Sequence, residues 1–405
     1  MNLIKVLRRI KNDAHTSVLF VLYFISKFTK RDYSLWLFGS GFGYADNSKY
    51  YFEEVKKIHP EIHAIWLSKS KEQTKQLAVK GIEAYYNFSW KGICLGLKAG
   101  VYIYTHRTSD INFFTSGGKI FKFDLWHGVA MKQIEYTITN GAMKSAFSGT
   151  FKSKFHNPYN YQKPDLLLSP GKKCDEIFKR SFLVGQSRLV HSVYPRCKQF
   201  FLKKKDMEEN LEKLGGIYYN MLCLLKKFNK SYIYMPTFRD SHGNFLEEAG
   251  FNLPKLNDAL KKNNALFIIK VHPATFPYLG DIPKYSNIYI VKKQFDIYPL
   301  LPFFDTLITD YSSIYFDYLL LNSEIILFPF DIENYQKKDR PFLFDYDKNI
   351  KGRKVYTFDN LIKLIDKNED CHLTKGEYQE MKEWFTSDDN VNDLTNFIKN
   401  RISSK

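Results

Sequence analysis

Short apolar runs recur along the first half of the chain at the intervals expected when strands and helices alternate. Apolar and polar positions at helical spacing predict helices over residues 47–58 and 73–80. Continuous apolar runs predict buried strands at residues 35–38, 63–67, 101–104, 120–126 and 165–169. Because strands that alternate with helices form parallel sheets, this pattern indicates a doubly wound α/β domain.

The second half of the chain repeats the same pattern. A charged segment from Lys203 to Leu214 is broken by Gly215 and Gly216, and we place a domain boundary near it. Apolar runs then predict strands at residues 231–235, 266–271, 288–291, 306–309 and 324–328, followed by a polar, helical tail over about 378–402. A chain of 405 residues exceeds what one core usually holds. We therefore predict an N-terminal arm at 1–32, one Rossmann-like domain at 33–204 and a second at 205–405.

One stretch, residues 306–317, combines a buried strand, a polar turn and the start of a helix. Ser312 or Ser313 is predicted to cap that helix with its side chain. The positive end of the helix dipole and the unpaired N–H groups would then face the crevice beyond the strand, where phosphate groups bind well. The alternative interpretation is that the two serines only cap a helix.

Two histidines and one arginine also follow predicted strands. His127 comes after the fourth strand, and Arg239 and His272 follow strands of the second half. In α/β proteins these strand ends face the ligand crevice, so a histidine there can act as a base and an arginine can bind phosphate oxygens. Together with a helix N-terminus they suit phosphoryl transfer. The alternatives are that each histidine has a core or capping role and that Arg239 pairs with Asp240.

The N-terminal arm carries an apolar run over residues 18–25 between basic residues, namely Lys5, Arg8, Arg9 and Lys11 before it and Lys27, Lys30 and Arg31 after it. The run falls short of the roughly 20 residues that a membrane span needs. A helix with basic flanks suits the surface of an anionic membrane. An ordinary first helix packed on the domain and a signal peptide are the other two interpretations.

Charge and cysteine usage narrow the possible partners. The chain has 60 Lys and Arg against 43 Asp and Glu, a net charge of +17, which favours an anionic partner such as lipid or a phosphate-bearing substrate. No nucleic-acid-binding motif accompanies that charge, so no nucleic acid is expected. The five cysteines are scattered without a C-x-x-C pair, which argues against structural zinc or a disulfide framework and fits a reducing cytoplasm.

Metal use is not expected, although one D-x-D sequence occurs at Asp345-Tyr346-Asp347. That sequence could form the metal and diphosphate clamp of a glycosyltransferase, but we expect it to lie at the surface near a strand or a turn.

An ordered set of motifs resembles the CDP-glycerol glycerophosphotransferases of teichoic acid and capsule synthesis. The resemblance covers roughly residues 34–347. The motifs are Trp126-His127-Gly128 with Lys132, Tyr234 to Asp240, Lys270-Val271-His272-Pro273, Leu307 to Ser313 with Phe316-Asp317, Pro329-Phe330-Asp331, Arg340-Pro341-Phe342 and Phe344-Asp345-Tyr346.

The resemblance implies a GT-B-like architecture, in which two Rossmann-like domains face one interdomain cleft. It implies transfer of a polyol phosphate from CDP-glycerol or CDP-ribitol to a hydroxyl of a membrane-linked polymer or lipid, with release of CMP and no cofactor or metal. The protein would act peripherally at the cytoplasmic face of the membrane. The implied catalytic residues are His127, as the base, and His272, near the diphosphate. The implied substrate-binding residues are Gly128, Lys132, Arg239, Lys270, Asp310, Ser312 and Ser313.

The chain departs from the pattern at two places. Val129-Ala130 follows the W-H-G motif where many relatives have Thr-Pro, and Pro341 stands where many have Gly. These departures leave open which polyol is transferred and which acceptor receives it. Two other functions stay open, namely a nucleotide-sugar glycosyltransferase on the same fold and a non-enzymatic protein that binds anionic lipid.

Overall fold

The first lobe of the protein is built on a seven-stranded parallel sheet. The computed structural model describes residues 3–140, 143–239, 244–272, 275, 282–291 and 295–404. In the first sheet the strand order is β3-β2-β1-β4-β5-β6-β7. The strands are β1 (Asp32–Phe38), β2 (His63–Ser68), β3 (Ala84–Tyr86), β4 (Ala99–Tyr104), β5 (Phe121–Asp124), β6 (Leu166–Ser169) and β7 (Leu189–His191).

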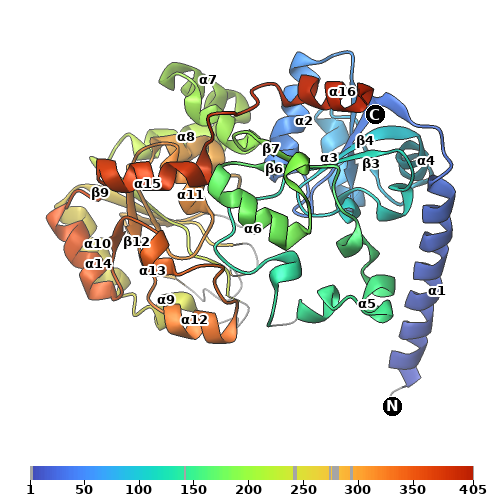
Figure 1. The fold of residues 1–405 in the computed structure, drawn as a ribbon. Helices are drawn as coiled ribbons and strands as arrows, with labels where there is room; N and C mark the ends of the chain where they lie inside the picture. Colours follow the sequence, from blue (N-terminus) through green and yellow to red (C-terminus); the bar gives the residue numbers. More distant parts are fainter. Residues whose placement is uncertain are drawn as a thin grey trace.

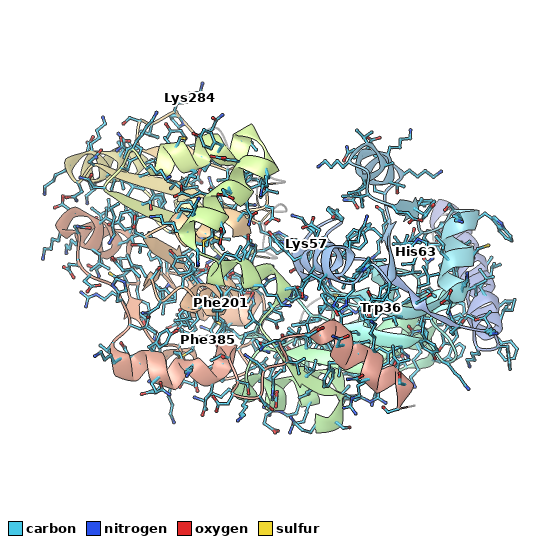
Figure 2. All side chains as sticks on the ribbon, turned by 90° about the horizontal axis from the view of Figure 1, so that it is seen from above. Trp36, Lys57, His63, Phe201, Lys284 and Phe385 are labelled. Atoms are coloured by element: carbon cyan, nitrogen blue, oxygen red, sulfur yellow. The ribbon has the colours of Figure 1, made fainter. Side chains whose placement is uncertain are left out.

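The second lobe is built on a six-stranded parallel sheet with the order β10-β9-β8-β11-β12-β13. Its strands are β8 (Lys230–Tyr234), β9 (Ala265–Ile269), β10 (Ile288–Ile290), β11 (Thr306–Thr309), β12 (Glu324–Leu327) and β13 (Arg353–Lys354). Figure 1 shows the two lobes side by side, with the blue and cyan segments in one and the yellow and orange segments in the other. In the view from above, Trp36 and His63 lie in the first lobe and Lys284 lies at the far edge of the second (Figure 2).

Helices surround both sheets. They are α1 (Leu3–Ser26), α2 (Asp46–Ile58), α3 (Lys71–Val79), α4 (Trp90–Lys98), α5 (Phe151–His156), α6 (Lys172–Phe182), α7 (Lys204–Leu214), α8 (Gly216–Leu225), α9 (Phe245–Glu248), α10 (Leu253–Lys262), α11 (Ile314–Leu319), α12 (Ile332–Lys338), α13 (Tyr346–Asn349), α14 (Phe358–Lys367), α15 (Lys375–Phe385) and α16 (Leu394–Ser403). Because helices cover the sheets, central strands such as β4 and β9 are buried along their whole length and read as continuous apolar runs.

The strand order of each sheet reverses at one point, between β1 and β4 in the first sheet and between β8 and β11 in the second. In open α/β sheets a ligand binds in the crevice at this point, beyond the carboxyl ends of the strands. The loops that follow these four strands are therefore the segments from which a site is expected to form.

The strands predicted from the sequence are present, with short additional strands at β3, β7 and β13. Two predicted strands are too long by two residues: the strand expected over 120–126 ends at Asp124, and the strand expected over 266–271 ends at Ile269. Trp126 has a φ of 50°, which an extended strand does not allow, so the chain has already turned there. The tail that was expected to be one helical stretch forms two separate helices, α15 and α16.

The last helix crosses back to the first lobe. Thr395 Oγ1 lies 2.9 Å from the hydroxyl of Tyr51 on α2, and Arg401 donates to the carbonyl of Ser187 at 2.7 Å. Figure 1 shows α16, in red, beside the blue α2. The predicted domain boundaries place this helix in the second domain, residues 205–405. Its contacts place it on the first, because its apolar face is buried there; the boundary itself stays a prediction.

Helix α1 is attached to the first lobe along one side only. Leu19 packs with Phe113 and Phe114, whereas Phe24 and Phe28 remain exposed. Within the described chain, no helix is both long enough and apolar enough to cross a membrane. The expected basic flank needs one correction: the guanidinium of Arg31 is buried, and it donates to the carbonyls of Ser26, Gly96, Ala99, Thr115 and Gly117. Arg31 therefore anchors the end of the helix.

Candidate active site

A cleft of about 480 Å³ lies between the lobes at the carboxyl ends of both sheets. This volume is within the range of small-molecule sites, which is about 300–1,000 Å³. Four of its lining residues from the first lobe are Phe42, His106, His127 and Lys132, and five from the second are Thr237, His272, Ser312, Ser313 and Arg340. Of the predicted site residues, His127, Gly128, Lys132, His272, Ser312 and Ser313 line this cleft, and Arg239, Lys270 and Asp310 do not.

The turn that carries His127 is held from both sides. The backbone N–H of Trp126 donates to the carboxylate of Asp124 at 2.8 Å, and the carbonyl of Trp126 accepts a bond of 2.8 Å from the side-chain amide of Asn47. These two bonds stabilise the left-handed conformation of Trp126, which an L-residue adopts only at a cost of about 1–3 kcal/mol. The turn thereby directs His127 away from the sheet and into the cleft.

The imidazole of His127 is arranged as a base. Its Nδ1 lies 3.1 Å from the carbonyl oxygen of Thr105, and a carbonyl only accepts, so Nδ1 carries the proton and Nε2 is the basic nitrogen. Burial, followed by repulsion from His106, lowers the pKa of His127 well below its ordinary value. The ring is therefore neutral at pH 7 and can accept a proton.

Gly128 brings the two lobes into direct contact. Its φ is 144°, and a Cβ placed on it would lie 2.6 Å from Oγ and 2.8 Å from Cβ of Ser313. Only glycine combines this backbone conformation with so close an approach. The W-H-G turn of the first lobe and the serine loop of the second therefore fit together only because position 128 has no side chain.

The serine loop does not cap its helix as predicted. Ser313 is the N-cap residue of α11, but its backbone is helical and its side chain makes no capping bond. The expectation that Ser312 or Ser313 caps the helix is wrong, because only backbone carbonyls of the loop accept at this end of the helix, from Tyr315 and Phe316. Both serines line the cleft, so their hydroxyls are available to a ligand. Thr237 contributes a third hydroxyl, which is buried and has no hydrogen-bond partner in the described part of the chain.

Arg239 lies behind the cleft wall in a buried ion-pair network. Its guanidinium donates to Asp310 at 2.9 Å, to Asp331 at 2.6 and 2.8 Å, and to the carbonyl of Thr237 at 2.7 Å. Asp310 is fully buried, and its other carboxylate oxygen accepts from the backbone N–H groups of Thr237 and Tyr311. The network fixes the loops after β8 and β11 against each other. The predicted phosphate contact of Arg239 and the nucleotide contact of Asp310 stay predictions, while Asp240, the suggested partner, lies outside the described residues.

His272 reaches the opposite side of the cleft from His127. Its ring lies 5.1 Å from that of Phe238, and the side chain is exposed. Partial desolvation, then repulsion from Lys270 and Lys132, lowers the pKa of His272. Two lysines from different lobes thus surround this imidazole with positive charge, which suits an anionic ligand. Pro273, quoted with this motif, lies outside the described residues.

Backbone and side-chain bonds hold the lobes together around the cleft. Gln133 donates to the carbonyl of Pro341 at 3.0 Å, and Leu343 donates to the carbonyl of Met131 at 2.9 Å. The Arg-Pro-Phe motif of the second lobe therefore pairs with the segment that follows the W-H-G motif.

Sequence reasoning missed two residues of the site. His106 lines the cleft two residues after β4, so the strand-end signal that identified His127 also applied to it. The second residue is Arg196. The structure shows its guanidinium donating to the carbonyl of His127 at 3.0 Å and to Asp317 of the second lobe at 2.7 Å, and no local pattern could have predicted those partners.

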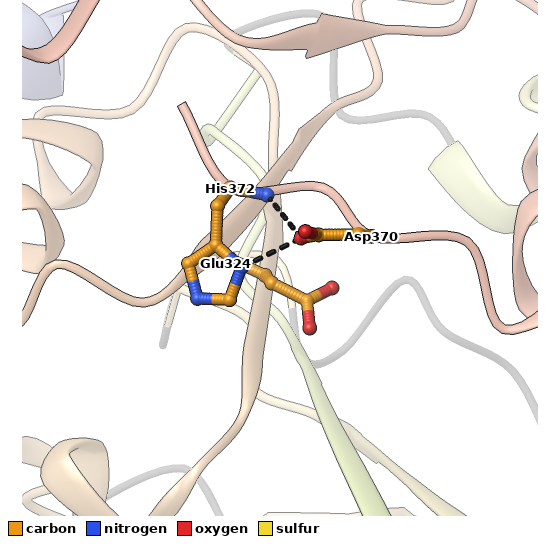
Figure 3. A group of neighbouring side chains, drawn as sticks. All are labelled: Glu324, Asp370 and His372. Carbon is orange, nitrogen blue, oxygen red and sulfur yellow. Dashed lines mark hydrogen bonds and ion pairs between the residues drawn. The ribbon is translucent and has the colours of Figure 1, made fainter. Parts of the chain in front are cut away.

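One group among the described residues could present three ligand atoms to a metal ion, namely Glu324, Asp370 and His372 (Figure 3). It lies at the amino-terminal end of β12, the opposite edge of the sheet from the cleft. Its acceptors already have partners: Lys230 donates to Glu324, and Asp370 accepts from both the backbone and the ring of His372. We assign no metal to it. The D-x-D sequence is at the surface, with Asp345 capping α13 and Asp347 bonded to Tyr356.

Two parallel sheets whose switch points face one cleft, with a basic histidine on one wall and free hydroxyls on the other, define a GT-B-like transferase. The sequence profile of CDP-glycerol:poly(glycerophosphate) glycerophosphotransferases matches residues 19–398, and the chain belongs to this family. The predicted family, fold class and enzyme class, a phosphotransferase, are thereby confirmed.

Individual relatives agree with this assignment. The chain is 26% identical to a teichoic acid glycerol-phosphate transferase of Staphylococcus aureus (strain NCTC 8325 / PS 47), over 84% of each chain. It is 31% identical to a teichoic acid glycerol-phosphate primase of Bacillus subtilis (strain 168), over 60% of this chain and 59% of that one. It covers only 43% of a teichoic acid poly(glycerol phosphate) polymerase of Staphylococcus epidermidis.

Among solved structures, the wall teichoic acid polymerase TagF has a TM-score of 0.72 at 22% identity, over 99% of this chain and 96% of that chain. This likeness concerns the fold alone.

Proposed function

We propose that the protein transfers a polyol phosphate, in the first place glycerol phosphate, from CDP-glycerol to a hydroxyl of a membrane-linked teichoic acid acceptor and releases CMP. The observation that carries this proposal is the position of neutral His127 in the same cleft as Ser312 and Ser313 of the other lobe. Relatives that handle glycerol phosphate and ribitol phosphate both support the donor class, so CDP-ribitol is the alternative donor. A capsule polymer is the alternative acceptor.

His127 acts as the general base in this proposal. Its Nε2 takes the proton from the acceptor hydroxyl, whose oxygen attacks the phosphorus nearest the polyol while the bond from that phosphorus to CMP breaks. The hydroxyls of Ser312, Ser313 and Thr237 donate to the donor phosphates, Lys132 supplies positive charge, and the neutral imidazole of His272 can donate a hydrogen bond to the diphosphate. Gly128 allows the serine loop to approach. Arg239 and Asp310 hold the loops from behind, and Lys270 lies close to His272.

Attachment to the membrane surface belongs to the same proposal. The exposed face of α1 carries Val18, Val21 and Ile25 at helical spacing, with exposed fractions of 59%, 60% and 47%, and Phe28, in the turn that follows the helix, is 76% exposed. Lys27 and Lys30 are exposed at the end of this apolar row. An apolar face beside basic residues binds the headgroup region of an anionic bilayer. We propose that α1 attaches the protein peripherally to the cytoplasmic face, where a membrane-linked acceptor would be within reach.

Release of CMP tests the proposed function. Purified protein is incubated with CDP-glycerol, and separately with CDP-ribitol, with and without a crude membrane acceptor. We expect acceptor-dependent CMP from one of the two donors and a new phosphodiester in the product. A His127→Asn variant should lose this activity, whereas His372→Asn, at the opposite edge of the second sheet, should retain it. A folded protein that releases no CMP from either donor with a competent acceptor would contradict the proposal.

A further inference from the structure

His106 is a second imidazole at the centre of the cleft, and the proposed chemistry has not yet used it. Its ring stacks on that of His127, with the centroids 4.1 Å apart and the planes at 24°. The side chain of His106 is 20% exposed and lines the cleft. It follows β4, at the point where the strand order of the first sheet reverses.

A buried carboxylate holds His106. The backbone N–H of His106 donates to Oδ2 of Asp110 at 2.9 Å, and the ring Nδ1 lies 3.7 Å from the same oxygen. Lys69 contacts the other carboxylate oxygen at 3.4 Å. Burial alone would raise the pKa of Asp110, but the bonds and charge of His106 and the charge of Lys69 lower it to about 2. The carboxylate is therefore ionised and fixes the backbone and ring of His106 beside it.

In each of the two stacked imidazoles, Nδ1 faces a group of the protein itself. His127 donates from Nδ1 to the carbonyl of Thr105, and Nδ1 of His106 faces Asp110 and, at 3.4 Å, the hydroxyl of Thr105. In the described part of the chain no hydrogen bond reaches Nε2 of either ring. Both Nε2 atoms are therefore available to a ligand in the cleft.

We propose that His106 is a second catalytic imidazole, which Asp110 holds in the cleft and which donates from Nε2 to a non-bridging oxygen of the phosphoryl group in transfer. His127 accepts the proton of the attacking hydroxyl, the new oxygen–phosphorus bond forms, and CMP leaves with the electrons of the bond that breaks. His106 gives up no proton in this step. The inference rests on the proposed function and adds a residue to the same site.

The surrounding charges favour this division of roles. Burial, His106 and Arg196 lower the pKa of His127, and Asp110 opposes them more weakly. On the other side, Glu135, paired with Arg107, also faces His106. Two stacked imidazoles do not readily carry positive charge together, and His127, whose pKa is lowered, is the one that acts as the base.

Two measurements test this role of His106: an NMR titration of the substrate-free protein and an assay of CMP release. Titration of the imidazole signals by NMR, with labelled histidine, follows His127 in the wild type and in His106→Gln. His106→Gln should raise the pKa of His127, since repulsion from His106 is removed. CMP release by His106→Gln should fall about 100-fold, the usual effect of losing one such donor. The acidic limb of its kcat/KM profile should move to higher pH.

His63 provides the matched control, because it is a surface histidine whose Nε2 lies 2.8 Å from the carboxylate of Glu83. His63→Gln should leave the rate, the acidic limb and the titration of His127 unchanged. A His106→Gln enzyme with the wild-type rate and pH profile would overturn the inference, as would an unchanged pKa of His127 in that variant. Wild-type protein that releases no CMP would overturn both the proposed function and the catalytic role of His106. In that case the titration of His127 in His106→Gln would still show whether the two imidazoles interact.

Discussion

The guanidinium of Arg196, in the first lobe, donates to Oδ2 of Asp317, in the second lobe, from Nη2 at 2.7 Å and from Nε at 3.2 Å. Both side chains are buried, and the same guanidinium also bonds Asp46 and the carbonyl of His127. One ion pair therefore connects the two lobes and positions the backbone of the proposed base.

Asp317→Ala should destabilise the protein by roughly 3 kcal/mol, at the low end of the cost of leaving a buried charge unpaired, because Asp46 still contacts Arg196. Activity should fall with it, since the carbonyl of His127 loses a fixed donor. Thermal unfolding and CMP release measure the two effects. Glu208→Ala is the control, because it breaks an ion pair with Lys226 at the surface and should change stability by less than about 1 kcal/mol. Equal effects of the two substitutions would contradict the role of Arg196.

Gly128→Ala should reduce CMP release about 100-fold, because the added methyl group meets Ser313 and displaces the turn that carries His127. Combining it with Ser313→Gly should restore only part of the activity, since the φ of 144° remains unfavourable for alanine. Gly185→Ala is the matched control: nothing lies within 4 Å of the added carbon. If Gly128→Ala retained wild-type activity, close packing of the two loops would not matter for catalysis.

Arg239→Gln should destabilise the protein by about 3 kcal/mol, because Asp310 would be left buried without a cation. The KM for the donor should change little in the protein that remains folded.

Thr237→Val should instead leave stability unchanged, since the hydroxyl has no partner to lose, and should raise the KM for CDP-glycerol. Unfolding curves and the donor KM, measured for Arg239→Gln and Thr237→Val, show which residue acts on stability and which acts on donor binding. A stable Arg239→Gln enzyme with a raised donor KM would restore the predicted phosphate contact.

His191 should make stability depend on pH. Its two ring nitrogens lie 2.8 Å from Asp389 and 3.0 Å from Asp175, and these carboxylates, Asp175 first, raise the pKa of His191. A raised pKa in the folded state stabilises the protein fully below the unfolded value of about 6.5, and the contribution is lost as the pH rises through the folded value. His191→Asn should therefore lower the unfolding midpoint more at pH 6 than at pH 9. If the unfolding midpoints of wild type and variant differed by the same amount at both pH values, His191 would not be protonated in the folded state.

Phe24→Ser combined with Phe28→Ser should reduce binding to vesicles that contain anionic lipid, because Phe24 is exposed on α1 and Phe28 is exposed in the turn that follows it. Vesicle sedimentation at two salt concentrations measures the binding, and salt should weaken it. Val79→Ser removes an equally exposed apolar side chain from α3 and should have no effect. Unchanged binding of the double variant would exclude α1 as the membrane contact.

Periodicity and residue type determined the two α/β halves, the order of the main strands and the location of His127, Arg239, His272 and the serine loop at strand ends. These features are local: a buried strand must be apolar, and the loop after it is where polar groups can project into a crevice. His106 was accessible to the same reasoning and was overlooked. The ordered motifs also identified the family.

Only the tertiary structure decided which of these strand-end residues meet a ligand. Arg239 and His127 carry the same local signal, yet one is enclosed by Asp310 and Asp331 and the other lines the cleft. The pairing of Arg196 with Asp317, 121 positions away, and the return of α16 to the first lobe depend likewise on how the lobes pack. Such contacts join segments far apart in the chain, and their partners are chosen by the burial of charge and apolar surface in the whole molecule, which no local pattern records.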